Sequence, residues 1–468
     1  MTVISNIVYI FQSEHYEIMR SLSVIYRLWL KLFSRTSQSP TRTLKAKLAT
    51  GWALIWMMAG IIWALTFAYQ YQSVAAYWYS VIAMIAIIIC SPLIFGVMIA
   101  ITNIAIKRYF RHKAKLAEQL ILNTGAIVIG ISWSYGKTTM KHILAHMIQW
   151  SGKSCIYPSW TINTYEWIIQ WVIQYCNKPV DFIVIEMWEY YPGDVDQIAQ
   201  LVHPHSVIVT GATYQHFERF GTEQKLVDTL LEWVRYIDTQ GVTLYNADSQ
   251  LLTKYIPKDH TQYIAYSNAI VRHVGILPNL AWMQFDYEWV TYQTKLLWSH
   301  IPATIGWAIE LLKHYGLDQH LQDSISQIQP IEHRMQLRVF GHTDTAILDD
   351  AFNGNLEWYK SMIQLINQQS RSWPVIYITP GIIEWGSMSQ EIHQTIAQHL
   401  CEALISELWL IDTSSTALIV NHLNKNLNYQ VKHFATMQQA LNQMTNYHYS
   451  HTLFVIQNDR PELYVILK

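Results

Sequence analysis

The stretch AIVIGISWSYGKTTMKHILAHMIQW, residues 126–150, decides the fold. Its first residues form an apolar, β-branched run that is typical of a buried strand, and apolar residues at spacings of three and four after Met140 are typical of a helix. The turn between them contains GKTT, so the segment has the strand, loop and helix order of a phosphate-binding loop. Backbone amides at the start of a helix bind anions. We therefore predict a nucleotide phosphate site formed by Ser134, Tyr135, Gly136, Lys137, Thr138 and Thr139.

Two side chains of this loop have predicted roles. Lys137 would contact the β and γ phosphates of ATP, and Thr138 would hold Mg²⁺. Trp133 is unexpected here, because the loop amides must approach phosphate oxygens closely and a small residue normally allows that approach.

Apolar runs that end in small or polar residues recur after residue 180 and alternate with helical patterns. This alternation predicts an α/β fold with parallel sheets and with its chemistry at the carboxyl ends of the strands. We expect a central P-loop ATPase domain at 107–335 and a Rossmann-like α/β domain at 336–468. The runs are DFIVIEM (181–187), SVIVTGA (206–212), VTLYNAD (242–248), AILDDAF (346–352), PVIYITPG (374–381) and ELWLIDTS (407–414).

The N-terminal part has a different composition. Residues 50–69 and 76–106 contain no charged side chain, and each run reaches the roughly 20 residues needed to cross a bilayer. Lys and Arg flank both outer ends and are absent from the connection between the runs. By the positive-inside rule we predict a cytoplasmic segment at 1–48, two transmembrane helices within 49–106, and both chain ends in the cytoplasm. The location would be the inner (cytoplasmic) membrane; buried core helices or a cleaved signal are the alternatives.

Composition excludes several functional classes. The formal net charge of -1 gives no basic field for a nucleic-acid partner. The four cysteines, Cys90, Cys155, Cys176 and Cys401, have no metal-ligand spacing and suggest neither a zinc site nor a disulfide framework.

From about residue 120 to the end, the chain resembles the Mur ligase family, in the branch that adds D-alanyl-D-alanine to a UDP-N-acetylmuramoyl-tripeptide. The matching motifs occur in the family's order. They are SWSYGKTT (132–139), PSWTINTYEWI (158–168), EMWEYYPGDV (186–195), TGATYQHFERFG (210–221), NADS (246–249), LLWSHI (296–301), PIEHRMQ (330–336), LDDAFNGN (348–355) and TPGIIEWGS (379–387).

The resemblance implies ATP-dependent amide formation on a peptidoglycan precursor through an acyl phosphate, with an amino acid or dipeptide as the second substrate. It implies Mg²⁺ ligation by Thr138, Glu186 and His216, and catalytic roles for Lys137, Glu186, His216 and Arg334. Asp349, Asp350 and Asn353 would orient the nucleotide and substrate, as would Arg334. The structural alternative for Glu186 is a solvated side chain at a strand end, and for His216 an ordinary histidine. For Asp349, Asp350 and Asn353 it is an Asx-rich turn.

The chain departs from the family at several positions. Leu230 stands where the family has a carbamylated lysine, with Lys225 five residues earlier, and Ile301 replaces an asparagine that contacts adenine. The membrane segment stands in place of the family's uridine-nucleotide domain. A catalytically impaired nucleotide-binding or scaffold protein on the same fold is therefore the alternative function.

Five tryptophans stand at family glycine positions, in a chain with 20 Trp and only 18 Gly. A bulky side chain at a close-approach glycine disrupts the backbone geometry that the site needs. Our hypothesis is that the codons at these positions are UGA. The source organism would read UGA as glycine, whereas the translation that gave this sequence reads it as tryptophan. The alternative is genuine tryptophan in an impaired enzyme. The positions are Trp133, Trp160, Trp188, Trp298 and Trp385.

Overall fold

The computed structural model describes most of the chain in two compact units, Met1–Lys115 and Leu116–Lys468. The described ranges are 44–132, 136–159, 162–188, 192–210, 222–238, 240–255, 263–277, 280, 282–340, 345–351, 356–369, 373–382, 389–412, 414–424, 427–445 and 451–457.

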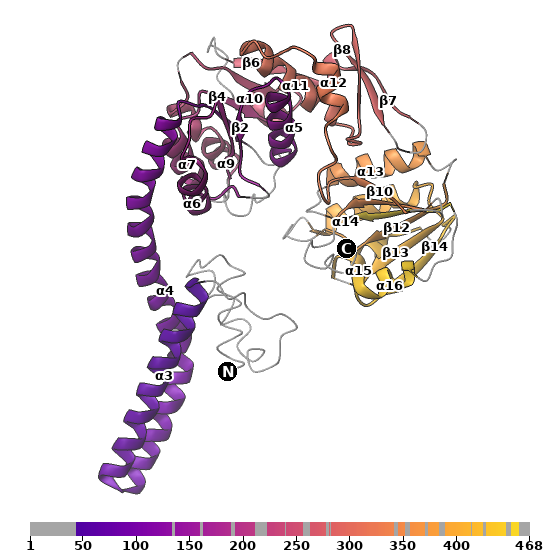
Figure 1. Ribbon diagram of the computed structural model, residues 1–468. Helices are drawn as coiled ribbons and strands as arrows, with labels where there is room; N and C mark the ends of the chain where they lie inside the picture. The colour runs from indigo at the N-terminus through magenta and orange to yellow at the C-terminus, as the bar shows by residue number, and fades with distance from the viewer. Residues whose placement is uncertain are drawn as a thin grey trace. The chain divides into compact units, whose positions relative to one another are not determined.

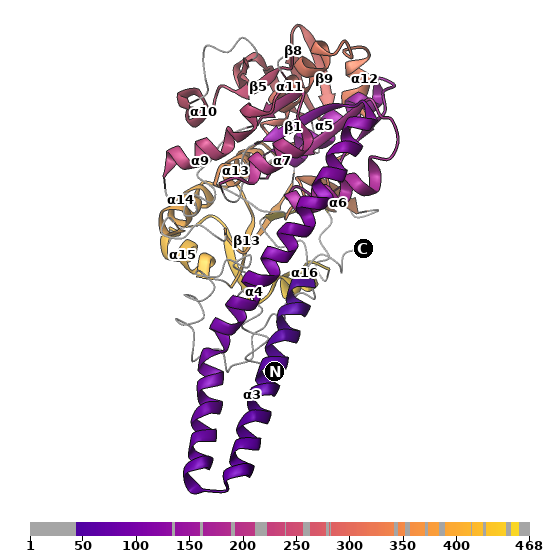
Figure 2. The ribbon, with the colours of Figure 1, turned by 90° about the vertical axis from the view of Figure 1, so that its left-hand side faces the viewer.

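Two long helices, α3 (Leu44–Tyr71) and α4 (Val74–Thr124), form an antiparallel hairpin in the first unit (Figures 1 and 2). Gln72, with φ 39°, lies in the turn between them. Small residues make their contact: Ala64, Ala68 and Ala76 are buried, and Ser80 Oγ donates a hydrogen bond to the Ala64 carbonyl at 2.9 Å. Helix α4 continues without a break to Thr124, into the second unit.

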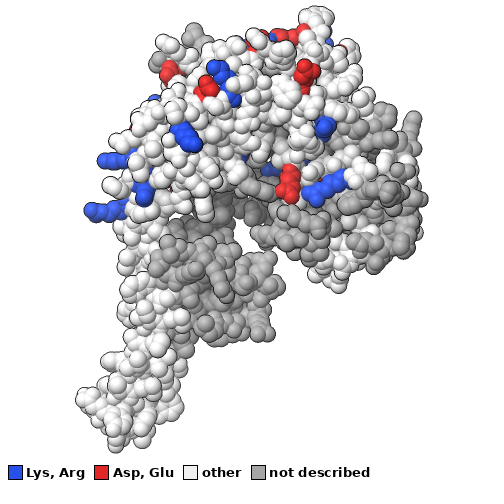
Figure 3. All heavy atoms as spheres, viewed as in Figure 1, with Lys and Arg blue, Asp and Glu red and all other residues white. Residues whose placement is uncertain are grey.

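The outer surface of the hairpin is apolar. Large apolar side chains such as Ile62 (57% exposed) and Leu65 (59%) face outward along α3. On the face visible in Figure 3 the end of the hairpin carries no charged atoms. Among the described residues one helical segment, Leu54–Tyr71, is long and apolar enough to cross a membrane, and Val74–Ala86 is a shorter apolar stretch. The predicted pair of membrane spans is therefore kept as a proposal.

The second unit contains a parallel six-stranded sheet in the order β2-β3-β1-β4-β5-β6. Its strands are β1 (Ile127–Ser132), β2 (Cys155–Ile156), β3 (Phe182–Glu186), β4 (Ser206–Val209), β5 (Thr243–Asn246) and β6 (Tyr263–Tyr266). Crossover helices allow parallel neighbours and bury both faces, which explains the continuous apolar runs. Helix α5 (Lys137–Trp150) contacts α11 (Ile301–His314) and α12 (Leu321–Ser326). Helix α7 (Asp194–Val202) contacts α6 (Tyr165–Tyr175) and α9 (Glu223–Leu230), and α10 (Gln250–Tyr255) contacts α9 (Figure 1).

A small antiparallel sheet and a second large sheet follow. The small sheet contains β7 (Arg272–Ile276), β8 (Met283–Tyr287) and β9 (Val290–Thr294). The large sheet has the order β10-β11-β15-β12-β13-β14, with only β10 (Gln336–Phe340) antiparallel to its neighbour β11 (Thr345–Asp350). Its other strands are β12 (Val375–Thr379), β13 (Glu407–Ile411), β14 (Gln430–Phe434) and β15 (Leu453–Gln457), with helices α13 (Leu356–Gln369), α14 (Ser389–Cys401), α15 (Ser414–His422) and α16 (Met437–Thr445). The parallel α/β architecture predicted from the sequence is confirmed.

Candidate functional site

The predicted phosphate loop leads from β1 into α5. Gly136 precedes the helix with φ 79°, a left-handed conformation that glycine adopts without strain. Its carbonyl accepts the hydrogen bond from the Met140 amide at 2.9 Å, which starts the helix. The helix N-terminus, with Lys137 and Thr138 in its first turn, therefore lies directly after the carboxyl end of β1.

Glu186 lies beside this helix because β1 and β3 are parallel neighbours, with Ile131 paired to Glu186. Both carboxylate oxygens of Glu186 contact α5. Oε2 accepts a hydrogen bond from Thr138 Oγ1 at 3.3 Å, and Oε1 lies 2.7 Å from Lys141 Nζ. Lys141 and Glu186 are 0% and 1% exposed, so this is a fully buried ion pair. Residues 138 and 141 lie one turn apart on the same face of α5, which lets one carboxylate contact both.

Lys137 is also buried, at 5% exposed. Its Nζ lies 5.2 Å from the centre of the Trp188 ring, just after β3. An ammonium over an indole face is a favourable cation–π contact. Trp188 is one of the tryptophans at family glycine positions, so the lysine predicted to contact phosphate is in contact with one of these residues.

Arg334 lies in the segment that precedes β10 and also belongs to the site. Burial lowers the pKa of Arg334 to about 10, against the opposing effects of the Asp350 and Glu186 carboxylates. Its guanidinium carbon lies 5.2 Å from the centre of the Trp358 ring. Burial also raises the pKa of Asp350 well above its ordinary value, while the charge of Arg334 opposes this shift. Arg334 is thus electrostatically coupled to the strand-end carboxylates of both large sheets.

Asp349 and Asp350 end β11 and have different partners. Asp349 Oδ2 lies 2.9 Å from His333 Nδ1 and 3.5 Å from an Arg338 nitrogen. Asp350 Oδ2 accepts a hydrogen bond from Gln457 Nε2, at the end of β15, at 3.1 Å. Both carboxylates are therefore fixed by neighbouring side chains at the carboxyl end of β11, in the second large sheet.

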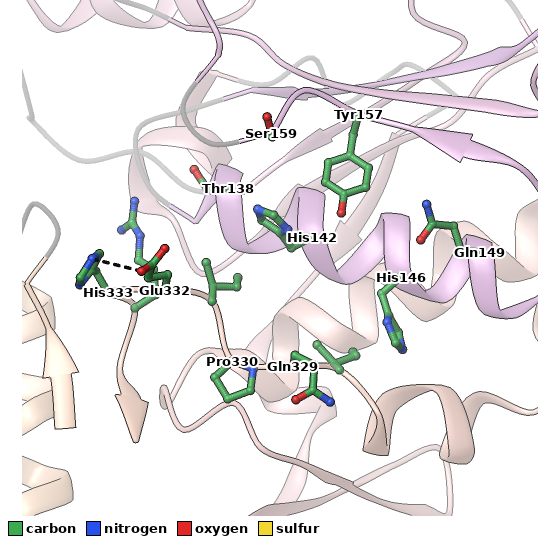
Figure 4. Close-up of a pocket in the computed structure, with 13 residues that line it drawn as sticks. Thr138, His142, His146, Gln149, Tyr157, Ser159, Gln329, Pro330, Glu332 and His333 are labelled. Carbon is green, nitrogen blue, oxygen red and sulfur yellow. Dashed lines mark ion pairs between the residues drawn. The ribbon is translucent and has the colours of Figure 1, made fainter. Parts of the chain in front are cut away.

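A cavity of about 340 Å³ adjoins Thr138 and Arg334. Figure 4 shows Thr138, His142, His146 and Gln149 following one another along α5, with His146 pointing toward the segment that carries Gln329 and Pro330. Burial and, to a smaller extent, the Lys141 cation lower the pKa of His142 to about 4, so this ring is neutral near pH 7. The cavity wall near the helix therefore combines neutral polar groups with apolar surface. It is lined by Thr138, His142, His146, Gln149, Tyr157, Ser159 and Ile328–Arg334.

Residues 131–290 match the Mur ligase middle domain. The matched range contains the loop, Glu186, the end of β1 and strands β2 to β6 of the first sheet.

Individual relatives of the Mur ligase type agree with this match. The chain is 23% identical over 308 residues to the UDP-N-acetylmuramoyl-tripeptide–D-alanyl-D-alanine ligase of Borreliella burgdorferi, covering 63% of this chain and 64% of the relative. It is 21% identical over 324 residues to the ligase of the same name from Mycobacterium tuberculosis, covering 66% and 62%. The chain thus spans a little under two thirds of the length of these curated relatives.

The Mur ligase likeness extends to solved structures. The crystal structure of the MurF ligase from Thermotoga maritima in complex with ADP superposes with a TM-score of 0.64, at 16% identity, over 75% of this chain and 80% of that one. At this identity the likeness establishes the fold, which is the mixed α/β Mur ligase fold with parallel sheets.

The structure brings some of the predicted Mur ligase site residues together. Thr138 and Glu186 are in contact, and Lys137 begins the same helix. Arg334 is coupled to Glu186 and Asp350 through charge. Four predicted residues lie outside the described part of the chain: Ser134, Tyr135, His216 and Asn353. Within the described part no group of three His, Cys, Asp or Glu side chains could hold a metal ion by itself.

Sequence reasoning missed Lys141 and the cavity histidines. The signal for Lys141 was its spacing: it lies four residues after Lys137, so both side chains lie on the same face of the predicted helix. A lysine in that position is usually solvated, and only the buried position of Glu186 next to it shows the pairing. Leu230, at the family's carbamylated-lysine position, is 0% exposed and belongs to the core.

Proposed function

We propose that this chain is an ATP-dependent acid–amino acid ligase that forms an amide bond on a peptidoglycan precursor. The observation that carries the proposal is the contact of Glu186 with Thr138 at the start of α5, inside a segment that matches the Mur ligase middle domain. The relatives' names support a UDP-N-acetylmuramoyl-tripeptide as acceptor and D-alanyl-D-alanine as the incoming unit.

ATP would bind with its phosphates at the N-terminus of α5. The amides from Ser134 to Thr139 would surround the phosphate oxygens, with Gly136 supplying the turn. The cavity beside Thr138 would then take the nucleoside end, because His142, Gln149 and Tyr157 offer the polar groups and flat surfaces that a base needs.

The residues fit a magnesium ion bound jointly with the nucleotide. Mg²⁺ prefers oxygen ligands and is commonly held by one or two side chains, waters and substrate phosphates. Thr138 Oγ1 and Glu186 Oε2, in contact at 3.3 Å, would supply the protein oxygens, and His216 would serve a second ion. When bound, the ion neutralises phosphate charge.

The chemical step would transfer the γ-phosphoryl group of ATP to the acceptor carboxylate, giving ADP and an acyl phosphate. The amine of the incoming dipeptide would attack the acyl carbon, form the amide and release phosphate and a proton. Lys137 and Arg334 would neutralise the charge on the transferred group. Asp349 and Asp350, at the end of β11, would orient the nucleotide and the incoming substrate together with Asn353.

The hairpin would anchor the enzyme in the cytoplasmic membrane with the catalytic domains in the cytoplasm. Its apolar residues face outward, and its helix contact uses Ala and Ser, which suits packing in lipid. Tyr69, Tyr71 and Trp78 are 78%, 59% and 64% exposed around the turn, where aromatic side chains favour the membrane–water interface. An anchored enzyme would act on a precursor at the cytoplasmic face of the bilayer.

The proposal is tested by ADP release from the purified full chain with ATP, UDP-N-acetylmuramoyl-tripeptide and D-alanyl-D-alanine. We expect release only when both substrates are present, together with a product whose mass equals their sum less one water. ADP release that is independent of both substrates would contradict a ligase.

A second candidate, a catalytically impaired nucleotide-binding protein, is favoured by one contact. Lys137 Nζ lies 5.2 Å from the Trp188 ring, and a lysine held there is kept from a phosphate. In this case ADP would bind with no turnover of any substrate pair, and Trp188→Gly would increase nucleotide affinity.

A further inference from the structure

Lys141 is a buried cation to which the proposed reaction assigns no role. It is 0% exposed and lies on α5, one turn after Lys137 and Thr138. Burial lowers the pKa of Lys141, and the adjacent Glu186 carboxylate opposes this shift. A charged group in such a place is costly unless its partner is well aligned. Glu186 Oε1, 2.7 Å from Lys141 Nζ, supplies the opposite charge as a close ion pair.

The geometry of Glu186 shows what the pair does. Its Oε1 is held by Lys141 at 2.7 Å, and its Oε2 is directed to Thr138 Oγ1 at 3.3 Å. Without the lysine, a carboxylate at a strand end could rotate about its side-chain torsions. With Lys141 present, one oxygen is fixed and the other stays beside the hydroxyl at the start of the helix.

We propose that Lys141 is a positioning residue for the metal–nucleotide site. It fixes the carboxylate of Glu186 so that Oε2 and Thr138 Oγ1 present two oxygens to a divalent cation that accompanies the nucleotide phosphates. The lysine acts through Glu186 and contacts neither metal nor nucleotide. This inference rests on the proposed function, because it assumes that a nucleotide binds at the start of α5.

The electrostatic surroundings support a positioning role. Lys141 neutralises Glu186, so the site carries little net negative charge before the nucleotide arrives. The cation would then bind strongly only together with phosphates, as expected for a nucleotide-dependent metal site. Arg334, in the segment before β10, is coupled to Glu186 through charge and adds to this balance.

The test measures by calorimetry how Mg²⁺ changes the affinity of the full chain for ADP. It uses both the chain with Trp133 and a Trp133→Gly background. Residues that hold a metal ligand in place by hydrogen bonds or charge typically contribute about 10–100-fold to metal affinity. For Lys141→Met we expect the Mg²⁺ concentration that gives half the enhancement to rise at least about tenfold. ADP affinity without Mg²⁺ should change less than about twofold, since Lys141 does not contact the nucleotide.

Three further variants separate positioning from folding. Lys141→Arg keeps the cation and should retain most of the Mg²⁺ enhancement. Lys141→Met/Glu186→Gln removes both buried charges; it should recover thermal stability relative to Lys141→Met without recovering the enhancement. Lys153→Met breaks a surface pair with Asp181 at 3.5 Å and should change neither.

Each outcome bears on a distinct claim. An unchanged Mg²⁺ enhancement in folded Lys141→Met overturns the inference and leaves the proposed function standing. If Lys141→Met does not fold, a double variant that keeps the full enhancement overturns the inference instead. A chain that binds no ADP in either background contradicts the proposed function, and the inference fails with it.

Discussion

Trp289 adopts a backbone conformation that few residues except glycine tolerate. It lies with Glu288 in the two-residue turn between β8 and β9, where Tyr287 pairs with Val290. Both turn residues have positive φ, 46° at Glu288 and 69° at Trp289, which defines a hairpin turn that favours glycine in its second position. The Trp289 side chain is 95% exposed. Position 289 thus joins the five family glycine positions on evidence independent of any resemblance.

Trp298 supports the alternative, that the residue is a genuine tryptophan. It is 3% exposed, and its ring centre lies 5.1 Å from that of Trp358, so it has a packing role in the core. The nucleotide sequence of the gene decides between glycine encoded by UGA and genuine tryptophan encoded by UGG. We expect UGA codons at 133, 160, 188, 289 and 385, and UGG at all of them would defeat the reassignment hypothesis.

Trp289→Gly should stabilise the chain. Relief of the left-handed conformation outweighs the flexibility that glycine adds to the unfolded chain, by roughly 0.5–1 kcal/mol. Trp167→Gly is the matched control, because Trp167 is also exposed (59%) but lies within α6. There glycine should cost about 1 kcal/mol. Thermal unfolding measures both, and a lower midpoint for Trp289→Gly would contradict the turn argument.

Lys137→Ala should abolish ATP turnover with the fold intact, because this lysine would act on phosphate charge. Lys153→Ala, in an exposed ion pair of the same domain, is the control. Steady-state ADP release and circular dichroism report the two effects. Turnover within about twofold of the parent would exclude Lys137 from the site.

At the scale of the elements, the hairpin of α3 and α4 is the feature that the proposed location depends on. Apolar runs and flanking cations predict two helices, and the structure adds the Ala64–Ser80 contact that joins them. The sequence did not show that α4 runs unbroken from Val74 to Thr124, because the pattern after residue 106 changes from apolar to amphipathic while remaining helical.

The turn at Ser73 should face the outside of the membrane. In a background without Cys90 and Cys401, Ser73→Cys should react with an impermeant thiol reagent added to intact cells. Lys113→Cys should react only after the cells are opened. Labelling of position 73 from the cytoplasmic side alone would eliminate the hairpin proposal.

Helix α5 should make stability dependent on pH through His142. Its pKa falls from an ordinary value near 6.5 to about 4 in the folded chain. Between these values the unfolded chain binds a proton that the folded chain does not, so stability decreases as the pH falls through this window. His142→Gln should therefore show a shallower loss of unfolding midpoint from pH 6.5 to 4 than the parent. The exposed His320→Gln variant should follow the parent, and equal slopes in all three would contradict the assignment.

At the scale of the whole molecule, the sequence predicted the fold class well because strand runs and crossover helices repeat with their own periodicities. The contact of Glu186 with Thr138 follows from the same topology, since parallel strands end at one edge of a sheet. The Lys141–Glu186 pair could not be predicted, because burial depends on tertiary packing. The small β7–β9 sheet was also missed, because its exposed strand β7 lacks an apolar run.

The central claim is that this chain activates a carboxylate with ATP. The most direct measurement follows ¹⁸O from a labelled carboxylate of the UDP-N-acetylmuramoyl-tripeptide during turnover with D-alanyl-D-alanine. Attack of the carboxylate on the γ-phosphorus places one carboxylate oxygen in the released phosphate, so we predict phosphate that carries a single ¹⁸O. Turnover that yields amide product and phosphate without ¹⁸O would contradict the account.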